Sequence, residues 1–394
     1  MTAAQTTDSG FLGNTLPKHG LGGDSFKNPI QTSGNLGIFS VASSRPCRIH
    51  LEHRNASVPL ISNSHFRPPW WLRGGHLQTL WPAVGRRVPF DPYQRERLEL
   101  IDGDFLDLDW SRSASAPASR LSQRNNRVVI VSHGLEGNSQ RTYIRGCVRA
   151  LNRRGWDVVA WNFRGCSGEP NRLPRAYHSG EIEDLSAVIA HVVNKGAYEM
   201  VALAGFSLGG NMTLRLLGAL GGHAKSHRIF GAVVFSVPCD LKSAAEKMSR
   251  RSAQPYLKSF LRTMNRKAAL TAARFPECFP RQLSEQEWLK IRTFREFDDQ
   301  FTAPLHGFKD AEDYWATSSS KLILGQITVP TLILNARNDP FLAPSCFPFA
   351  DAILSPAVWL EVPADGGHVG FCPAGDQTEY WHETRAAEFL ERLR

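Results

Sequence analysis

The stretch "GFSLGG", residues 205–210, brackets one serine with glycines where an apolar run gives way to a helical pattern. The preceding "EMVALA" is typical of a buried strand, and the following "NMTLRLLGAL" repeats apolar residues every three or four positions. A serine hydroxyl becomes a strong nucleophile when a base removes its proton, and many enzymes present such a serine on a sharp strand-to-helix turn. Glycine permits the close backbone approach that this turn requires. The pattern therefore predicts Ser207 as a nucleophile; the alternative is a tight turn that merely contains serine.

The chain around this turn alternates strand and helix patterns. Continuous apolar runs precede Gly-containing loops and amphipathic segments in "RVVIVSHG", "WDVVAWNFRG" and "EMVALAG". This alternation predicts a mostly parallel central sheet with helices on both faces, an α/β fold. Upstream, "RLELIDGDFLDLDW" alternates apolar and polar residues around Asp102-Gly103, which predicts an opening antiparallel hairpin.

Two regions depart from this alternation. Residues 1–64 are rich in Gly, Ser, Thr, Asn and Pro and show no periodicity, which predicts a disordered tail before a folded domain over residues 65–394. Residues 241–320 contain no convincing core strand, and we expect a helical insertion that acts as a lid. Within it, "SEQEWLKIRTFREF" starts with a capping box of Ser284 and Glu287. The apolar residues that follow at helical spacing are Trp288, Ile291 and Phe294.

The formal net charge of +9 is concentrated in one part of the chain. Residues 241–274 hold nine Lys or Arg residues against one acid, Glu246. No helix-turn-helix, RNP-like or finger pattern accompanies them, so we expect no nucleic-acid partner. A solvated helical face is the simpler interpretation. The other is peripheral contact of this basic insertion with an anionic lipid or an acidic substrate headgroup.

The composition also bears on location. No apolar run reaches the roughly 18 residues of a membrane span, and the N-terminus lacks the basic start and apolar centre of a secretory signal. Sparse acidic residues near the N-terminus also fit a transit peptide, although the first arginine is Arg45. Seven scattered cysteines without a C-x-x-C spacing argue against a disulfide framework or a zinc site. We therefore expect a cytoplasmic protein without a transmembrane segment.

A serine nucleophile needs a histidine base and a carboxylate that orients it, each on a loop beyond a strand end and in the chain order Ser, acid, His. "TLILNARNDP" places Asp339 a few residues after an apolar run, and "AVWLEVPADGGHVGF" places His368 late in the chain. Both follow Ser207 in the required order. Asp240, which follows "VVFSVPC", is an alternative acid, and Asp365 is expected to belong to the histidine loop.

The tetrahedral intermediate of acyl transfer also needs hydrogen-bond donors for its oxyanion. The backbone N–H of Leu208, directly after the nucleophile, is the first candidate. The second is the backbone N–H of Leu135, in the "SHGLEGN" loop that follows the first central strand. His133 in the same loop is expected to hold the loop in place.

Several stretches together resemble one protein family. They are "PPWWLRGGHLQTLWP", "SHGLEGNSQRTYIRG", "WNFRGCSGEPNRLPRAYHSGEIEDL", "GFSLGGNM", "FREFDDQFTAPLHGF", "LILNARNDPF" and "GGHVGF". Over residues 65–394 the chain is similar to the YheT-type branch of the α/β-hydrolases, AB hydrolase family four. The resemblance implies the α/β-hydrolase fold, a Ser-Asp-His triad on Ser207, Asp339 and His368, and esterase or acyltransferase chemistry on acyl esters.

The functional expectation is a serine hydrolase that cleaves short- to medium-chain acyl esters or lipids through an acyl-enzyme. An insertion over the site favours an apolar acyl chain sheltered from water. Neither a G-x-G-x-x-G nor a G-K-S/T phosphate loop is present in the sequence, so no cofactor is expected, and no metal. Two alternatives stay open: an acyltransferase that uses the same acyl-enzyme, and a catalytically silent hydrolase fold used for binding.

Overall fold

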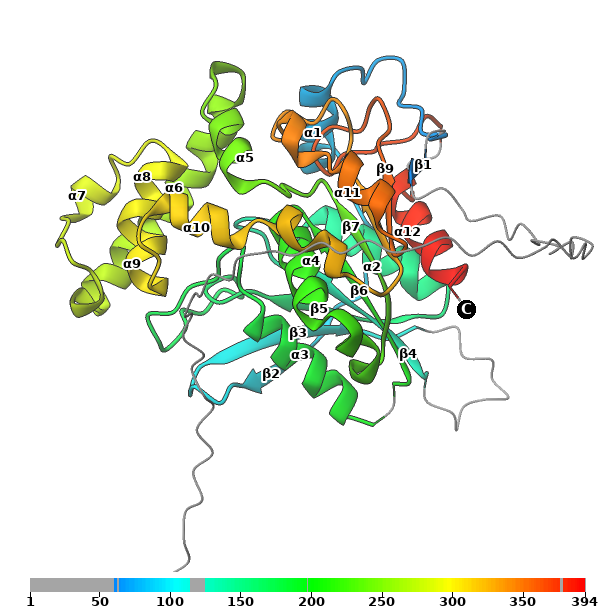
Figure 1. The fold of residues 1–394 in the computed structure, drawn as a ribbon, viewed down its shortest axis with the longest axis horizontal. Helices are drawn as coiled ribbons and strands as arrows, with labels where there is room; N and C mark the ends of the chain where they lie inside the picture. The colour runs from blue at the N-terminus through cyan, green and yellow to red at the C-terminus, as the bar shows by residue number, and fades with distance from the viewer. Residues whose placement is uncertain (1–59, 62–63, 114–124, 197, 376–377, 394) are drawn as a thin grey trace, which may run out of the picture. The chain divides into compact units, whose positions relative to one another are not determined.

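A twisted sheet forms the centre of the molecule (Figure 1). The computed structural model describes residues 60–61, 64–113, 125–196, 198–375 and 378–393. Within them a nine-stranded sheet has the order β1-β9-β8-β7-β6-β4-β5-β3-β2. The strands are β1 (Leu60–Ile61), β2 (Gln94–Glu99), β3 (Phe105–Ser111), β4 (Arg127–Ser132), β5 (Asp157–Asn162), β6 (Met200–Phe206), β7 (Ile229–Phe235), β8 (Thr331–Leu334) and β9 (Val358–Glu361).

Only β3 among these strands runs against the others. It pairs antiparallel with both β2 and β5, and the remaining neighbours pair in parallel. The turn between β2 and β3 contains Gly103 at a φ of 86°, a conformation that glycine adopts without a steric cost. The predicted hairpin and the predicted mostly parallel α/β sheet are both confirmed.

Helices cover both faces of the sheet. On one face α2 (Thr142–Arg153) packs against α12 (Trp381–Glu391). On the other lie α3 (Glu183–Asn194), α4 (Leu208–Leu220) and α11 (Phe349–Leu354). Two apolar clusters fill the layers between sheet and helices, one on each face. Since the parallel strands are buried on both sides, their sequences read as continuous apolar runs rather than alternating ones.

The chain between β7 and β8 forms the helical insertion, which Figure 1 shows beside the sheet in green to yellow. The described residues of this segment contain helices and no strand. The α-helices are α5 (Leu241–Met248), α6 (Gln254–Arg274), α7 (Glu285–Trp288), α8 (Phe294–Phe297), α9 (Ala303–His306) and α10 (Ala311–Ser318). A separate apolar cluster, which includes Leu257, Trp288 and Phe301, forms the core of this insertion.

The capping box of Ser284 and Glu287 is present at the start of α7. The helical spacing that follows it does not continue as one helix, because α7 ends at Trp288 and α8 starts at Phe294. Thr293 explains the break: its backbone is extended, and its side chain accepts a hydrogen bond from the N–H of Glu296. Thr at such an N-cap favours a new helix start over continuation.

The N-terminal boundary differs from the prediction. Residues 1–59 lie outside the described residues, but Leu60–Ile61 pair with β9 as the edge strand β1. Two residues are too few to give a periodic signal, so the sequence placed them in the tail. The chain then forms α1 (Gly75–Val84). None of the described helices combines the length and the apolar character needed to cross a membrane.

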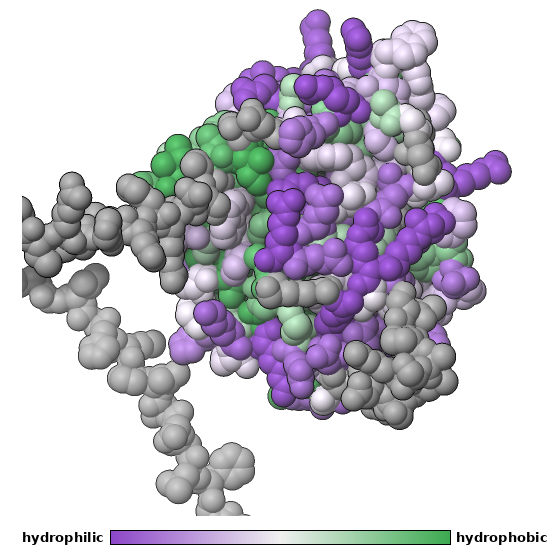
Figure 2. Space-filling view, turned by 90° about the vertical axis from the view of Figure 1, so that its right-hand side faces the viewer, coloured by the Kyte–Doolittle hydropathy of each residue, from purple (hydrophilic) through white to green (hydrophobic). Residues whose placement is uncertain are grey.

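The surface is mostly polar on the side opposite the helical insertion. Figure 2 shows the right-hand side of Figure 1, where hydrophilic side chains dominate and hydrophobic ones gather toward one edge. Such a face is typical of a surface in contact with water.

Candidate active site

Ser207 stands on the bend between β6 and α4. Its backbone is strained, with φ 52° and ψ −116°, and its N–H donates to the carbonyl of Phe235 at 2.8 Å. The flanking glycines make this bend feasible. A Cβ added at Gly205 would lie 2.6 Å from the carbonyl oxygen of Gly209, and one at Gly209 would lie 2.3 Å from the carbonyl oxygen of His133. A strained serine with such tight surroundings is typical of a nucleophile turn.

The structure brings the three predicted triad side chains together. His368 Nε2 lies 3.0 Å from Ser207 Oγ, and His368 Nδ1 lies 2.8 Å from Asp339 Oδ2. Because a carboxylate only accepts hydrogen bonds, Nδ1–H donates to Asp339. In the tautomer with its hydrogen on Nδ1, Nε2 can accept the Ser207 proton, as a general base requires.

Asp339 is held in one orientation. The carboxylate is buried, and its second oxygen, Oδ1, accepts the backbone N–H of Phe341 at 2.8 Å. This leaves Oδ2 for the histidine. The ring of Phe341 also packs on the imidazole, with 4.2 Å between ring centroids. Phe341 therefore contacts both Asp339 and His368.

Three hydrogen bonds from backbone N–H groups hold the loop that carries His368. The N–H of His368 donates to Thr79 Oγ1 at 2.9 Å, and the N–H of Val369 donates to Ser236 Oγ at 2.9 Å. The N–H of Gly367 donates to the side chain of Asn338 at 2.9 Å. Thr79 lies on α1, so this helix helps to hold the loop that carries His368.

The two predicted oxyanion donors are both near Ser207: Leu208 follows it in the chain, and Leu135 follows Gly134, which lies close to it in space. Leu208 is the first residue of α4, where N–H groups have no intrahelical acceptor. Leu135 follows Gly134, and a Cβ added at Gly134 would lie 3.3 Å from the Cβ of Ser207. Within the described residues the N–H of Leu135 has no hydrogen-bond acceptor. Both N–H groups are thus available to a ligand.

A polar network fixes the loop that contains Leu135. His133 donates to the carbonyl of Gly134 and accepts the N–H of Phe163, and burial lowers the pKa of His133 to about 3, so the ring stays neutral. This agrees with the predicted structural role of His133. The N–H of Gly134 donates to the hydroxyl of Tyr143 at 3.0 Å. These bonds leave Leu135 as the next free donor.

Glu136 joins this loop to the helical insertion. Its backbone has a left-handed φ of 53°, and its N–H donates to the hydroxyl of Tyr177 at 3.0 Å. Its carboxylate accepts from Tyr177 at 2.7 Å and from Lys267 of α6 at 2.9 Å. The insertion therefore contacts the candidate oxyanion loop directly.

Asp240 and Asp365, the other two acidic residues considered from the sequence, have other hydrogen-bond partners. Asp240 caps α5 by accepting the N–H of Ser243 at 3.1 Å, so it does not serve His368. Asp365 accepts from Asn338 at 2.8 Å in the histidine loop, where it was expected. No group of three or more His, Cys, Asp or Glu side chains in the described ranges is arranged to hold a metal ion.

Sequence reasoning did not single out Thr79, Ser236, Tyr143, Tyr177 or Lys267. Most of their contacts with the site join positions far apart in the chain, such as Thr79 and His368, which are 289 positions apart; Tyr143 and Gly134 are only 9 apart. Thr79, Tyr143 and Tyr177 do lie within stretches that carry the family resemblance, which was the one available signal.

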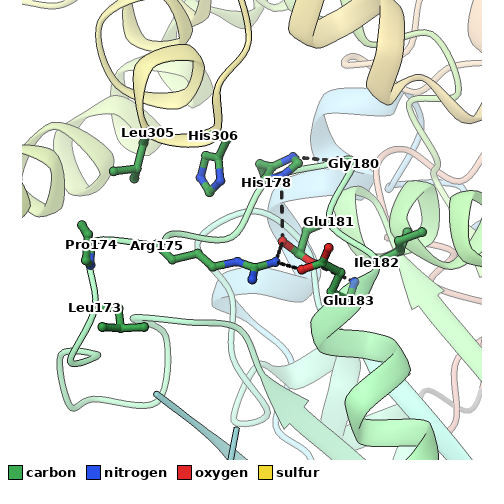
Figure 3. Close-up of a pocket in the computed structure, with 10 residues that line it drawn as sticks. All are labelled: Leu173, Pro174, Arg175, His178, Gly180, Glu181, Ile182, Glu183, Leu305 and His306. Atoms are coloured by element: carbon green, nitrogen blue, oxygen red, sulfur yellow. Dashed lines mark hydrogen bonds and ion pairs between the residues drawn. The ribbon is translucent and has the colours of Figure 1, made fainter. Parts of the chain in front are cut away.

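A separate hollow of about 540 Å³ opens between residues 173–183 and α9 (Figure 3). None of the triad side chains lines it. Arg175, which points into it, forms ion pairs of 2.7 Å with Glu181 and 2.5 Å with Glu183. The charge of this arginine is thus already neutralised, and the hollow is distinct from the candidate active site.

Comparison with known proteins agrees with this geometry. The family model described as the alpha/beta hydrolase fold matches residues 127–373. YheT of Escherichia coli (strain K12), whose name marks it provisionally as an esterase, is 38% identical over 84% of this chain and 94% of that protein. Phospholipase ABHD3 of Mus musculus is 28% identical over 79% of this chain and 74% of that protein.

A solved structure agrees at the level of the fold. The Pyrococcus furiosus esterase Pf2001 has a TM-score of 0.50 and 19% identity, over 78% of this chain and 95% of that chain. The match of the family model and the identity to YheT are both extensive. The chain belongs to the α/β-hydrolase fold family, in the branch that contains YheT.

Proposed function

We propose that this protein is a serine carboxylic ester hydrolase. The observation that carries the proposal is the continuous line of hydrogen bonds from Ser207 through His368 to Asp339, at 3.0 and 2.8 Å. The relatives named as esterase and phospholipase support the same class.

The reaction proceeds in two steps. Ser207 Oγ attacks the ester carbonyl carbon while His368 Nε2 takes its proton, and Asp339 stabilises the resulting imidazolium. The N–H groups of Leu135 and Leu208 bind the oxyanion, each lowering the barrier by about 3 kcal/mol. Collapse breaks the ester C–O bond, and His368 protonates the leaving alcohol. Water then attacks the acyl-enzyme by the same route and releases the acid.

The substrate class follows from what surrounds the triad. Phe341, which packs on His368, belongs to the apolar cluster of the helical insertion, and Leu135 packs against the same cluster. An apolar acyl group bound at Ser207 would therefore adjoin aromatic and aliphatic side chains rather than water. This favours acyl esters, including glycerolipids, over small polar esters.

A fluorophosphonate probe and a series of p-nitrophenyl esters of increasing chain length test the proposal. Wild-type protein should be labelled and active, and Ser207→Ala should lose labelling and at least about 10⁴-fold in turnover. Ser249→Ala, an exposed serine of the insertion, is the matched control and should behave as wild type. Unchanged labelling in Ser207→Ala would refute the proposal. Product analysis with an added alcohol separates hydrolysis from acyl transfer.

A further inference from the structure

Helix α1 has its polar side turned inward and its apolar side turned outward. Gln78 is fully buried, and Thr79 and Gly75 lie against the catalytic loops. Leu77, Leu80, Trp81 and Val84 recur at intervals of three and four and share the opposite face. All four are exposed. A surface helix in contact only with water has the reverse arrangement.

Two tryptophans before α1 extend this apolar face. Trp71 contacts Trp81 edge-on with 5.0 Å between ring centroids, and Trp70 precedes it. The exposed fractions are Trp70 79%, Trp71 41%, Leu77 52%, Leu80 48%, Trp81 37% and Val84 83%. We call these six residues the α1 apolar face. They are half of the twelve large apolar side chains that are exposed in the described part of the chain.

The charged residues in the segment that contains this face are all positive. Residues 64–90 contain four arginines and no acid. Arg86 is buried in an ion pair with Glu383, but Arg67, Arg73 and Arg87 are exposed and form no ion pair with any described residue. These three flank α1 on both sides in sequence, so the charge of the segment is complementary to an anionic surface.

The α1 apolar face lies close to the candidate active site. His76, at the start of α1, stacks on Tyr256 at the start of α6, with 3.1 Å between Nδ1 and the hydroxyl. Tyr256 contacts Phe341, which packs on His368. Near Tyr256 the insertion also exposes Arg250 and Arg251. Figure 1 shows α1 and the α5 end of the insertion at the same end of the molecule.

From these observations we infer that the α1 apolar face is a docking surface for an anionic lipid bilayer. Exposed tryptophans and leucines beside arginines are the composition that lies at the boundary of headgroups and acyl chains. No described helix can span a bilayer, so the contact is peripheral. Docking holds the lipid against the outer side of α1, whose inner side contacts the loops that carry Asp339 and His368, so that an acyl ester leaving the lipid has a short path to Ser207. Only this delivery step rests on the proposed function.

Flotation of the full chain with vesicles tests the docking itself. The chain carries Ser207→Ala, so that lipid stays intact, and vesicles are phosphatidylcholine alone or mixed with phosphatidylglycerol. The variant Trp70→Ser/Leu77→Gln/Leu80→Gln/Val84→Ser should bind the mixed vesicles at least about tenfold more weakly. The control removes four exposed apolar residues elsewhere and should bind normally: Leu270→Gln/Leu322→Gln/Ile353→Gln/Leu354→Gln.

Charge is tested separately with Arg73→Gln/Arg87→Gln. Binding to the mixed vesicles should fall about fivefold for each arginine removed. Added salt should also weaken the binding of the protein with both arginines, because it screens their charge. Binding to phosphatidylcholine alone should not change.

Three results would overturn the inference. One is equal binding to the mixed vesicles by the α1 variant and by the protein without the α1 substitutions. Another is a lower Tm of the α1 variant without lipid, which means that the protein's own chain covers the face. The third is a wild-type dimer that the α1 variant dissociates while vesicles do not bind, which assigns the face to a second copy. A failure of docking with normal turnover of water-soluble esters leaves the proposed function intact.

Discussion

Helices α1 and α3 are of similar length but face the protein in opposite ways. In α3 the apolar residues Leu185, Val188, Ile189 and Val192 are buried against the sheet. In α1 the polar residues Gln78 and Thr79 face inward and the apolar residues face outward. The difference follows from the partner of each helix. Helix α3 packs on apolar strands, whereas α1 packs on catalytic loops that expose backbone N–H and C=O groups.

The comparison shows that the period of a pattern does not tell which face of a helix is inside. A helix next to a sheet stabilises the fold by burying apolar area. A helix next to polar loops contributes hydrogen bonds, and its apolar side chains then need another partner. Substitutions in α3 should therefore affect stability, and substitutions in α1 should affect the site or the proposed lipid contact.

The largest effect on stability is expected in α3. Leu185→Ala removes a fully buried side chain from the core and should lower the free energy of unfolding by about 3 kcal/mol. Urea denaturation measures this change. The kcat of the folded variant should be unaffected, since α3 does not contact the triad. A loss below about 1 kcal/mol would contradict the assignment of α3 as a core helix.

The next largest effect is expected on catalytic activity, from a substitution in α1. Gly75→Ala places a Cβ 1.8 Å from the carbonyl oxygen of Asn338, so α1 must move away from the loops that hold Asp339 and His368. A displacement of about 1 Å lowers kcat/KM roughly 100-fold. The control Gly222→Ala adds a methyl group with no neighbour within 4 Å and should retain activity. Similar activity of the two variants would show that α1 does not position the site.

A smaller effect is expected from one hydrogen bond of α1. Thr79→Val keeps the shape of the side chain but removes the acceptor for the His368 N–H. An unmade buried hydrogen bond costs about 1–3 kcal/mol, so kcat should fall about tenfold while KM stays near its original value. Thr79→Ser retains the hydroxyl and should restore most of the rate. Equal rates for the two variants would exclude Thr79 as a positioning residue.

The sheet and the three central side chains were predictable because each has a local signature. Ser207 lies in a glycine-bracketed turn, and Asp339 and His368 follow apolar runs in a fixed order. The contacts that hold them were not predictable. Thr79 and Ser236 reach the histidine loop from distant parts of the chain, and a hydroxyl in a helix or at a strand end has no distinct pattern of its own.

The surface of α1 was not predictable for a different reason. The sequence alone favours an interior position for its aromatic residues, because large apolar side chains are usually buried. The inward orientation of Gln78 and Thr79 instead depends on the loops at Asn338 and Gly367, which contact α1 only in the folded protein. A pattern with period 3.6 is the same whichever side faces solvent.

The smallest expected effect is on stability, and it compares α1 and α3 directly. Leu80→Ala in α1 makes the same chemical change as Leu185→Ala in α3, but Leu80 is half exposed. Its removal should change the free energy of unfolding by no more than about 0.5 kcal/mol, as for most surface positions, because much less buried area is lost than at Leu185. Urea denaturation of both variants under one condition gives the contrast. If Leu80→Ala is as destabilising as Leu185→Ala, then α1 is a core helix whose apolar face packs against protein, and the two helices do not differ in the way proposed.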